Sequence, residues 1–151
     1  MKKFQFKFET VLKVKEKKEE QLKRELMKLQ AMKIEQEQIL KLIEEEKNGA
    51  MKDKAREKGA GTDIMSIVLF EQYLNSLRSQ IKHSENNIKE LENLSDDKRM
   101  EVVEASREKK IFEKLEDKHR AVFNKTVENN EQKQLDEIAV SKYNRKEQHN
   151  Y

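Results

Sequence analysis

The sequence has no proline, no cysteine and no tryptophan, and only three glycines among 151 residues. Without proline, no position is barred from helix. Without cysteine, the chain has neither a disulfide framework nor a thiolate nucleophile, and its composition is compatible with a reducing compartment. The glycines, at positions 49, 59 and 61, fit no phosphate-binding pattern. These absences exclude a disulfide-stapled fold, thiol chemistry and a nucleotide-binding loop.

Apolar residues are also scarce. They make up 34% of the chain, whereas charged residues make up 42%, against nearly half and a quarter in ordinary globular domains. So few apolar side chains cannot fill a thick core, but they can line a stripe between two long helices. The longest apolar run, Ile67 to Phe70, is too short to span a membrane, and the N-terminus lacks the pattern of a secretion signal. We therefore expect a cytoplasmic protein without direct membrane insertion.

The charges are mixed rather than segregated. There are 33 basic and 30 acidic residues, for a net charge of +3, and Lys alternates with Glu through stretches such as residues 13–25. This pattern is typical of a solvated helix surface with ion pairs, whereas nucleic-acid binders concentrate basic charge. We expect no nucleic-acid partner. A nucleic-acid-associated helical rod is an alternative that a steep fall of DNA affinity with salt would support.

Two apolar stripes with seven-residue spacing run along the chain. Such spacing is typical of helices that pack along a narrow seam. The first stripe extends from Phe4 to Ile43 and comprises Phe8, Leu22, Leu29 and Ile43 on one row, Leu12, Leu26 and Leu40 four residues beyond it, and Val11, Met32 and Ile39 three residues beyond it. The second stripe combines a row through Ile67, Leu74, Ile81, Ile88, Ser95, Val102, Lys109, Glu116 and Phe123 with a row through Phe70, Leu77, Ser84, Leu91, Lys98, Ala105, Phe112, His119 and Thr126.

The only clear interruption lies between these stripes, where Gly59-Ala60-Gly61 precedes Thr62-Asp63. Glycine ends a helix by adopting a left-handed conformation, and Thr or Asp caps the next helix. We therefore predict an all-α fold, a long antiparallel two-helix coiled-coil hairpin that forms one domain over residues 1–151. Its first helix covers about residues 3–57, its turn about 58–62 and its second helix about 63–145. Two chains that dimerise in parallel are the alternative arrangement.

No catalytic or metal-binding constellation is present. Glu116 and His119 have the Glu-x-x-His spacing of carboxylate di-iron helices, but those sites need a second such pair, and neither of the other two histidines follows a glutamate in this way. Asp96 and Asp97 read as a charged break in the seam rather than as an acid/base pair. No hydroxyl has both a base and a residue that orients it. We therefore predict no enzyme activity, no metal and no cofactor.

Aromatic residues gather at the start of the chain. Phe4, Phe6 and Phe8 alternate with polar residues where chain ends usually fray. They form either a local plug on the open end of the hairpin or an anchor for a partner, and both interpretations remain open.

Several segments resemble the FliJ family of the bacterial flagellar export apparatus. The start, FQFKFETVL at Phe4 to Leu12, is similar to the family's aromatic lead into its first helix. Phe70 to Leu77, the basic cluster Arg107 to Lys110 and Phe112 to Leu115 follow in the family's order. The most specific match is Glu131 to Ala139, which contains the motif LDEIA.

This resemblance implies a non-enzymatic protein-export component that is similar to the central stalk of rotary ATPases. Its paired terminal helices would dock in the hexameric ring of the export ATPase and promote its assembly. Its side would bind the cytoplasmic domain of the export gate, and it would also bind export chaperones. The expected location is the cytoplasm, peripheral to the inner membrane at the flagellar base. The processes implied are flagellum biogenesis, type III secretion, motility and chemotaxis.

The resemblance also implies two contact surfaces. Contact with the ATPase ring is expected from Phe4, Phe8 and Leu12, which would lie against Leu135, Asp136 and Ile138. Contact with the export gate is expected around Gln38, Leu42, Tyr73 and Leu77. For Leu42, Leu74 and Leu77, packing inside the coiled coil is the competing interpretation. The competing functions are a generic coiled-coil scaffold or chaperone, including an injectisome or rotary-ATPase stalk, and, least favoured, an enzyme.

Overall fold

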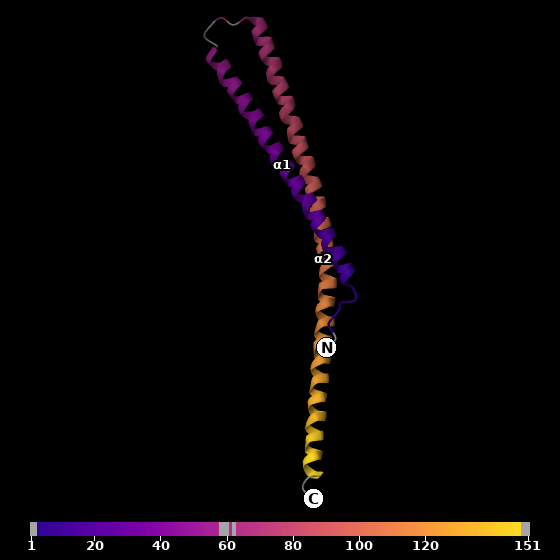
Figure 1. Ribbon diagram of the computed structural model, residues 1–151. Coiled ribbons are helices and arrows are strands. Elements are labelled where there is room, and N and C mark those ends of the chain that lie inside the picture. Colours follow the sequence, from indigo (N-terminus) through magenta and orange to yellow (C-terminus); the bar gives the residue numbers. More distant parts are fainter. Residues whose placement is uncertain (1–2, 58–60, 62, 149–151) are drawn as a thin grey trace. The chain divides into compact units, whose positions relative to one another are not determined.

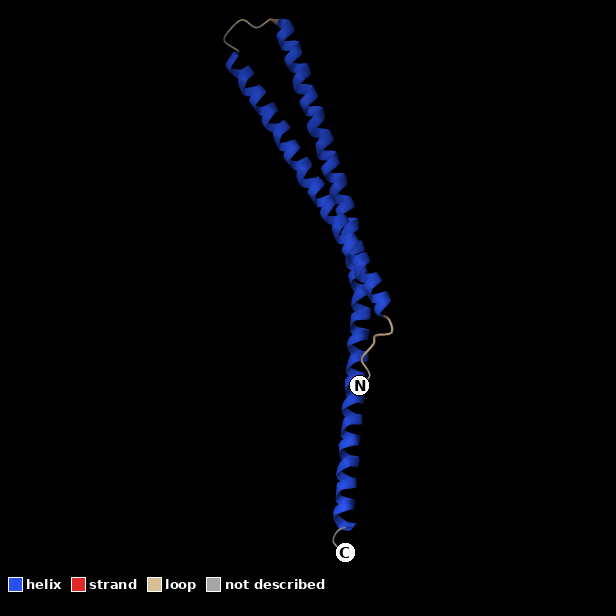
Figure 2. Cartoon of the chain, viewed as in Figure 1, coloured by secondary structure: helices blue, strands red, loops and turns tan. Residues whose placement is uncertain are grey.

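Two long helices make up nearly all of the described chain. The structure is a computed structural model that describes residues 3–57, 61 and 63–148, with side chains described as far as residue 143. Helix α1 covers Glu9–Glu57 and helix α2 covers Ile64–Gln148, with 49 and 85 residues respectively (Figures 1 and 2). These ranges contain no strand. The predicted all-α helical hairpin is confirmed.

Helix α1 begins at Glu9, whereas the sequence predicted a start near residue 3. In a helix from residue 3, Phe6 would point away from Phe4 and Phe8, because two residues turn the chain by about 200°. An irregular segment instead lets all three rings contact α2 (Figure 2). The helix then starts with the Leu12 N–H donating to the Phe8 carbonyl at 2.9 Å. Ring burial therefore outweighs the helix propensity of these residues.

The predicted turn is described only in part. Gly59, Ala60 and Thr62 lie outside the described residues. Among the residues that are described, no glycine has a positive φ, so Gly61 does not adopt the left-handed conformation. Helix α2 begins directly after Asp63, whose carbonyl accepts a hydrogen bond from the Ile67 N–H at 3.2 Å.

The chain divides into two compact units, and each helix contributes to both. The terminal unit comprises Met1–Glu19 and Ala105–Tyr151, and the central unit comprises Glu20–Glu104.

In the central unit, α1 and α2 run antiparallel. Cross-helix ion pairs show the register. Glu25 contacts Lys98 at 3.1 Å, Lys33 contacts Glu92 at 3.1 Å, and Lys54 contacts Glu71 at 3.0 Å, so partner numbers on α2 fall as numbers on α1 rise. In Figure 1 the two helical segments of this unit diverge toward the end where α1 stops and α2 begins. Five apolar residues from Ile64 to Leu69 are accordingly exposed there.

The seven-residue rows form the seam of this unit. Met32 and Ile39, which would widen the stripe on α1, are exposed, so the contact is narrower than the sequence suggested. Its buried or half-buried members on α1 are Leu22, Leu29, Gln36, Ile43 and Ala50 on one row and Leu26, Lys33, Leu40, Lys47 and Lys54 on the other. On α2 they are Phe70, Leu74, Leu77, Ile81, Ser84, Ile88, Leu91, Ser95, Lys98 and Val102.

In the terminal unit, the first turns of α1 pack on α2 near Ala105. Leu12, Glu19 and Ala105 are buried, and Lys15 Nζ lies 2.6 Å from a carboxylate oxygen of Glu108. Beyond residue 127, every described side chain of α2 is exposed. This unit therefore combines a paired section with a section of single helix.

Candidate partner-binding surfaces

The N-terminal aromatic residues form a strap, defined here as residues Phe4 to Phe8, across α2. The ring centroid of Phe4 lies 5.6 Å from that of Phe123, and that of Phe6 lies 5.7 Å from that of His119. Phe6 is only 5% exposed. The structure therefore shows the plug interpretation, in which the rings cover the seam of α2 within the terminal unit.

Two further contacts fix this strap. The rings of Phe8 and Phe112 approach edge to face, with centroids 6.3 Å apart. The guanidinium of Arg120 lies 5.3 Å from the Phe4 ring centroid and also pairs with Glu116 at 2.6 Å. Aromatic pairs at these distances add about 0.5–1.5 kcal/mol each beyond the apolar area they bury.

The strap corrects one expectation about the ring contact. Phe4, Phe8 and Leu12 do not lie against Leu135, Asp136 and Ile138. They pack on earlier turns of α2, and Leu12 is buried. The reason is length, because Leu135 follows Phe123, the residue reached by the first ring of the strap, by twelve residues, or about 18 Å of helix. The two predicted groups lie on the same unit but are not brought together.

The free end of α2, defined as residues 128–143, packs on no other helix among the described residues. All of its side chains are exposed. A single helix in water gains little from propensity alone, and most helical stability in proteins comes from burying an apolar face. The free end nevertheless carries four large apolar residues that are each more than half exposed, namely Leu135, Ile138, Val140 and Tyr143.

The expected gate contact divides into exposed and buried parts. Gln38, Leu42 and Tyr73 are exposed, whereas Leu77 is only 3% exposed and belongs to the seam. Leu77 therefore packs in the seam of the coiled coil in this structure. The Tyr73 hydroxyl donates to the Glu46 carboxylate. That hydrogen bond is the main reason that the Tyr73 pKa is raised above its ordinary value of 10.0.

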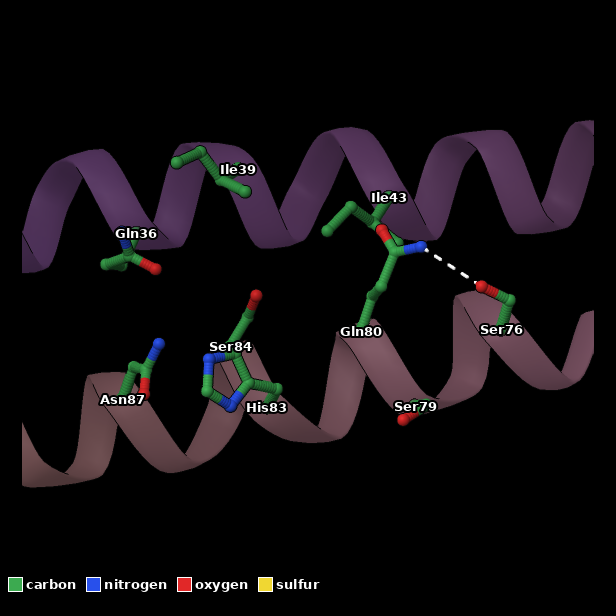
Figure 3. A pocket seen from close by; sticks show the side chains of 9 residues that line it. All are labelled: Gln36, Ile39, Ile43, Ser76, Ser79, Gln80, His83, Ser84 and Asn87. Atoms are coloured by element: carbon green, nitrogen blue, oxygen red, sulfur yellow. Dashed lines mark hydrogen bonds between the residues drawn. The ribbon is translucent and has the colours of Figure 1, made fainter.

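A groove between the helices of the central unit lies close to this region (Figure 3). It has a volume of about 550 Å³, and no Asp, Glu, Lys or Arg lines it. Gln80 Nε2 donates to Ser76 Oγ at 3.3 Å. Among the described residues, His83 makes no hydrogen bond to Ser79 or Ser84, so the groove holds no activated hydroxyl. Its lining is Gln36, Ile39, Ile43, Ser76, Ser79, Gln80, His83, Ser84 and Asn87.

A buried charge pair in the terminal unit was missed by the sequence analysis. Glu19 is 4% exposed, and its carboxylate lies 2.8 Å from Lys109 Nζ. The hydrogen bond that Lys109 donates to Glu19 is the first cause of the raised Lys109 pKa. The sequence did contain a signal that Glu19 faces the other helix, because Glu19 stands seven residues from both Leu12 and Leu26, which are apolar members of the same row.

The described ranges also hold no group of three or more His, Asp or Glu side chains that could bind a metal ion. In the same ranges, no helix is long and apolar enough to cross a membrane.

Comparison with known protein families gives a match over residues 4–148, to the family described as Flagellar FliJ protein. The chain belongs to the FliJ family. The resemblance inferred from the sequence is thereby confirmed, and this FliJ-family chain is a component of the flagellar protein-export apparatus. The family is a non-catalytic export component. No curated protein and no solved structure matches the chain.

Proposed function

We propose that this protein docks in the hexameric ring of the flagellar export ATPase, promotes ring assembly, and links the ring to the export gate and export chaperones. It acts as a single hairpin domain in the cytoplasm, peripheral to the inner membrane at the flagellar base, with no turnover of its own. Family membership supports the export role. The observation that carries the ring contact is the free end of α2, where apolar side chains have no cover.

The ring contact is assigned to Leu135, Asp136 and Ile138. The two apolar residues are more than half exposed, so docking would remove them from water, at roughly 25 cal/mol per Å² of apolar surface buried. Phe4, Phe8 and Leu12 take a different role from the one first expected. They brace the section of α2 that leads into the free end and so hold it for entry into the ring.

The gate contact is assigned to Gln38, Leu42 and Tyr73. These side chains are exposed, and Tyr73 is held by its hydrogen bond to Glu46, one turn beyond Leu42 on α1. Leu77 supports this surface from the seam. A tyrosine with a fixed hydroxyl and a largely apolar ring is a frequent interface residue.

The test is steady-state ATP hydrolysis by the export ATPase, with and without this protein, combined with sizing of the mixture. We expect stimulation and a shift to a ring-sized complex. Leu135→Asp should abolish both. Met100→Asp is the matched control, because Met100 is similarly exposed and the substitution changes charge equally. Equal loss in both variants, or no stimulation by a wild-type chain shown to be helical, would favour the generic scaffold instead.

A further inference from the structure

One face of α2 in the terminal unit is rich in positive charge, and between Lys110 and Lys125 its one acidic residue is Asp117. Lys110, Lys114 and Lys118 follow one another at four-residue steps, and Lys125 comes seven residues later. Residues with these spacings lie on one side of a helix. All four are exposed. We call them the lysine face; its members lie within sixteen residues, and Lys110 and Lys125 are about 22 Å apart along the helix axis.

Several cations elsewhere in the chain pair with an acidic residue four positions away on their own helix. Lys13 pairs with Glu9 at 2.6 Å, and Arg24 pairs with Glu20 at 3.6 Å. On the lysine face, by contrast, the residues four positions from Lys114 are both lysines.

Among the described residues, none of the four lysines forms an ion pair. The acidic residues nearest in sequence on the seam side are already engaged, since Glu113 contacts Lys109 at 3.5 Å and Glu116 contacts Arg120 at 2.6 Å. Like charges four residues apart destabilise a helix by about 0.2–0.5 kcal/mol per pair. The sequence therefore retains a small repulsion that a single Glu in place of Lys114 would remove.

The lysine face points away from the strap. Phe112, His119 and Phe123 contact the strap, and at about 100° per residue they lie on the opposite side of α2 from the four lysines. Two apolar residues, Ile111 and Val122, flank the lysines and are each more than half exposed. The four lysines are exposed on the outer side of one helix, and the surface of a single helix is convex.

We propose that the lysine face binds the surface of an anionic lipid bilayer. The positive charge of the lysine face complements acidic lipid headgroups. Near such a surface, each of the four lysines adds a similar electrostatic attraction. A straight, convex row of cations meets a plane at every position at once, whereas a folded acidic protein needs a complementary hollow or groove. Ile111 and Val122 reach only the headgroup boundary. The helix adsorbs without insertion, which is distinct from docking in the ATPase ring.

The test is flotation of the purified chain with vesicles of phosphatidylcholine that contain about 30% phosphatidylglycerol, with pure phosphatidylcholine vesicles alongside. The variant is Lys110→Gln/Lys114→Gln/Lys118→Gln. The matched control, Lys13→Gln/Arg24→Gln/Lys41→Gln, removes the same charge from positions with intrahelical partners. We expect the first variant to lose on the order of 100-fold in vesicle affinity and the control less than about threefold. Wild-type binding should fall steeply with salt.

Three results would overturn the proposal. They are equal binding to neutral vesicles, equal loss in both triple variants, and tighter binding to a duplex oligonucleotide than to anionic vesicles, which would favour nucleic acid. Glutamine is a good helix former, and circular dichroism of each variant verifies the fold. The vesicle assay contains no ATPase, so its failure would leave the proposed ring contact untouched, and failure of ring docking would leave this inference untouched.

Discussion

The carboxylate of Glu19 on α1 lies 2.8 Å from Nζ of Lys109 on α2, although Glu19 is almost fully buried. Glu19 stands between Leu12 and Leu26 on its row of the seam, and the row of Lys109 is largely apolar. Sliding α2 by one seven-residue repeat would place Val102 or Glu116 opposite Glu19, so the buried carboxylate would lose Lys109 and face an apolar side chain or a like charge. Such a state is strongly disfavoured. The pair therefore selects one register from several that the apolar rows alone would allow.

Removing this carboxylate tests its role. Glu19→Ala should lower the free energy of unfolding by about 1–3 kcal/mol, because Lys109 loses its principal partner. Glu16→Ala, one turn earlier and exposed, should change it by less than about 0.5 kcal/mol. Urea unfolding followed by circular dichroism measures both.

The double substitution Glu19→Leu/Lys109→Leu separates stability from register. It should be at least as stable as the wild type, since apolar replacements of buried ion pairs often are, but its pairing should become heterogeneous. Distances between spin labels at Lys13 and Lys114, both exposed, should broaden. A destabilised variant with a single sharp distance would contradict the register role.

Ser95 offers a second test of the seam. It is 4% exposed, and its Oγ has no hydrogen-bond partner among the described residues. A buried hydroxyl without a partner costs about 1–3 kcal/mol, so Ser95→Ala should be neutral or should stabilise the protein by up to about 1 kcal/mol. Ser79→Ala, on the exposed surface, is the control. A loss of more than about 1 kcal/mol at Ser95 would reveal an unrecognised partner.

Acid should weaken the central pairing. The Lys98 and Lys54 side chains hydrogen-bond to Glu25 and Glu71 and hold their carboxyl pKa values below the ordinary 4.5. A lowered carboxyl pKa gives stability that is present above the ordinary value and lost as pH falls through the folded value. The urea midpoint should therefore be level from about pH 7 to 5 and decline below about 4.5.

The matched variant for this acid effect is Glu71→Gln, whose midpoint should decline less in acid. Removing the Glu71 carboxylate removes one of the groups that titrates. A midpoint that rises as pH falls would show that these pairs do not stabilise the fold.

The strap should detach when its buried ring is removed. Phe6→Ala should accelerate amide hydrogen exchange at Leu12, whose N–H bonds to the Phe8 carbonyl. The cost should stay below the roughly 3–5 kcal/mol of an enclosed core phenylalanine, because a chain end can open locally. Gln5→Ala, at an exposed position between two rings, should leave exchange unchanged. Unaltered protection in Phe6→Ala would mean that Phe4 and Phe8 suffice.

Alanine substitutions of Leu77 and Leu42, the two leucines at the expected gate surface, should have opposite effects on stability and on gate binding. Leu77→Ala should destabilise the protein by about 2–5 kcal/mol, because the side chain is buried in the seam. Leu42→Ala should change stability by less than about 0.5 kcal/mol but weaken binding to the cytoplasmic domain of the export gate. Binding that survives Leu42→Ala at full strength would remove this surface from the proposal.

The sequence predicted the helices and most of the seam. On α2, the two rows that contain Leu74, Leu77 and Ile81 stood out because apolar residues at heptad spacing bury together on any partner helix. Polar residues on the rows of α1 gave no such signal. Lys33 and Lys54 in fact bond across the seam to Glu92 and Glu71, and long side chains can do so while their stems pack.

The spacing of apolar residues could not predict where α1 starts or which residues meet at the proposed ring contact. Helix propensity concerns neighbouring residues, whereas the Phe4 and Phe6 rings are held by Phe123 and His119 on the other helix. The residues that meet near the two chain ends depend on where each helix stops relative to the other. The strap reaches only as far as Phe123, so it does not contact Leu135.

The sequence by itself determined the class, the two helices and the family, because each depends on local propensity, apolar period and motif order along the chain. Only the tertiary structure decided which polar residues are buried, that Leu77 is buried whereas Leu42 is exposed, and where the strap lies. Those outcomes depend on contacts between residues about a hundred positions apart. Their energies arise from mutual burial and charge pairing, and neither is a property of one segment alone.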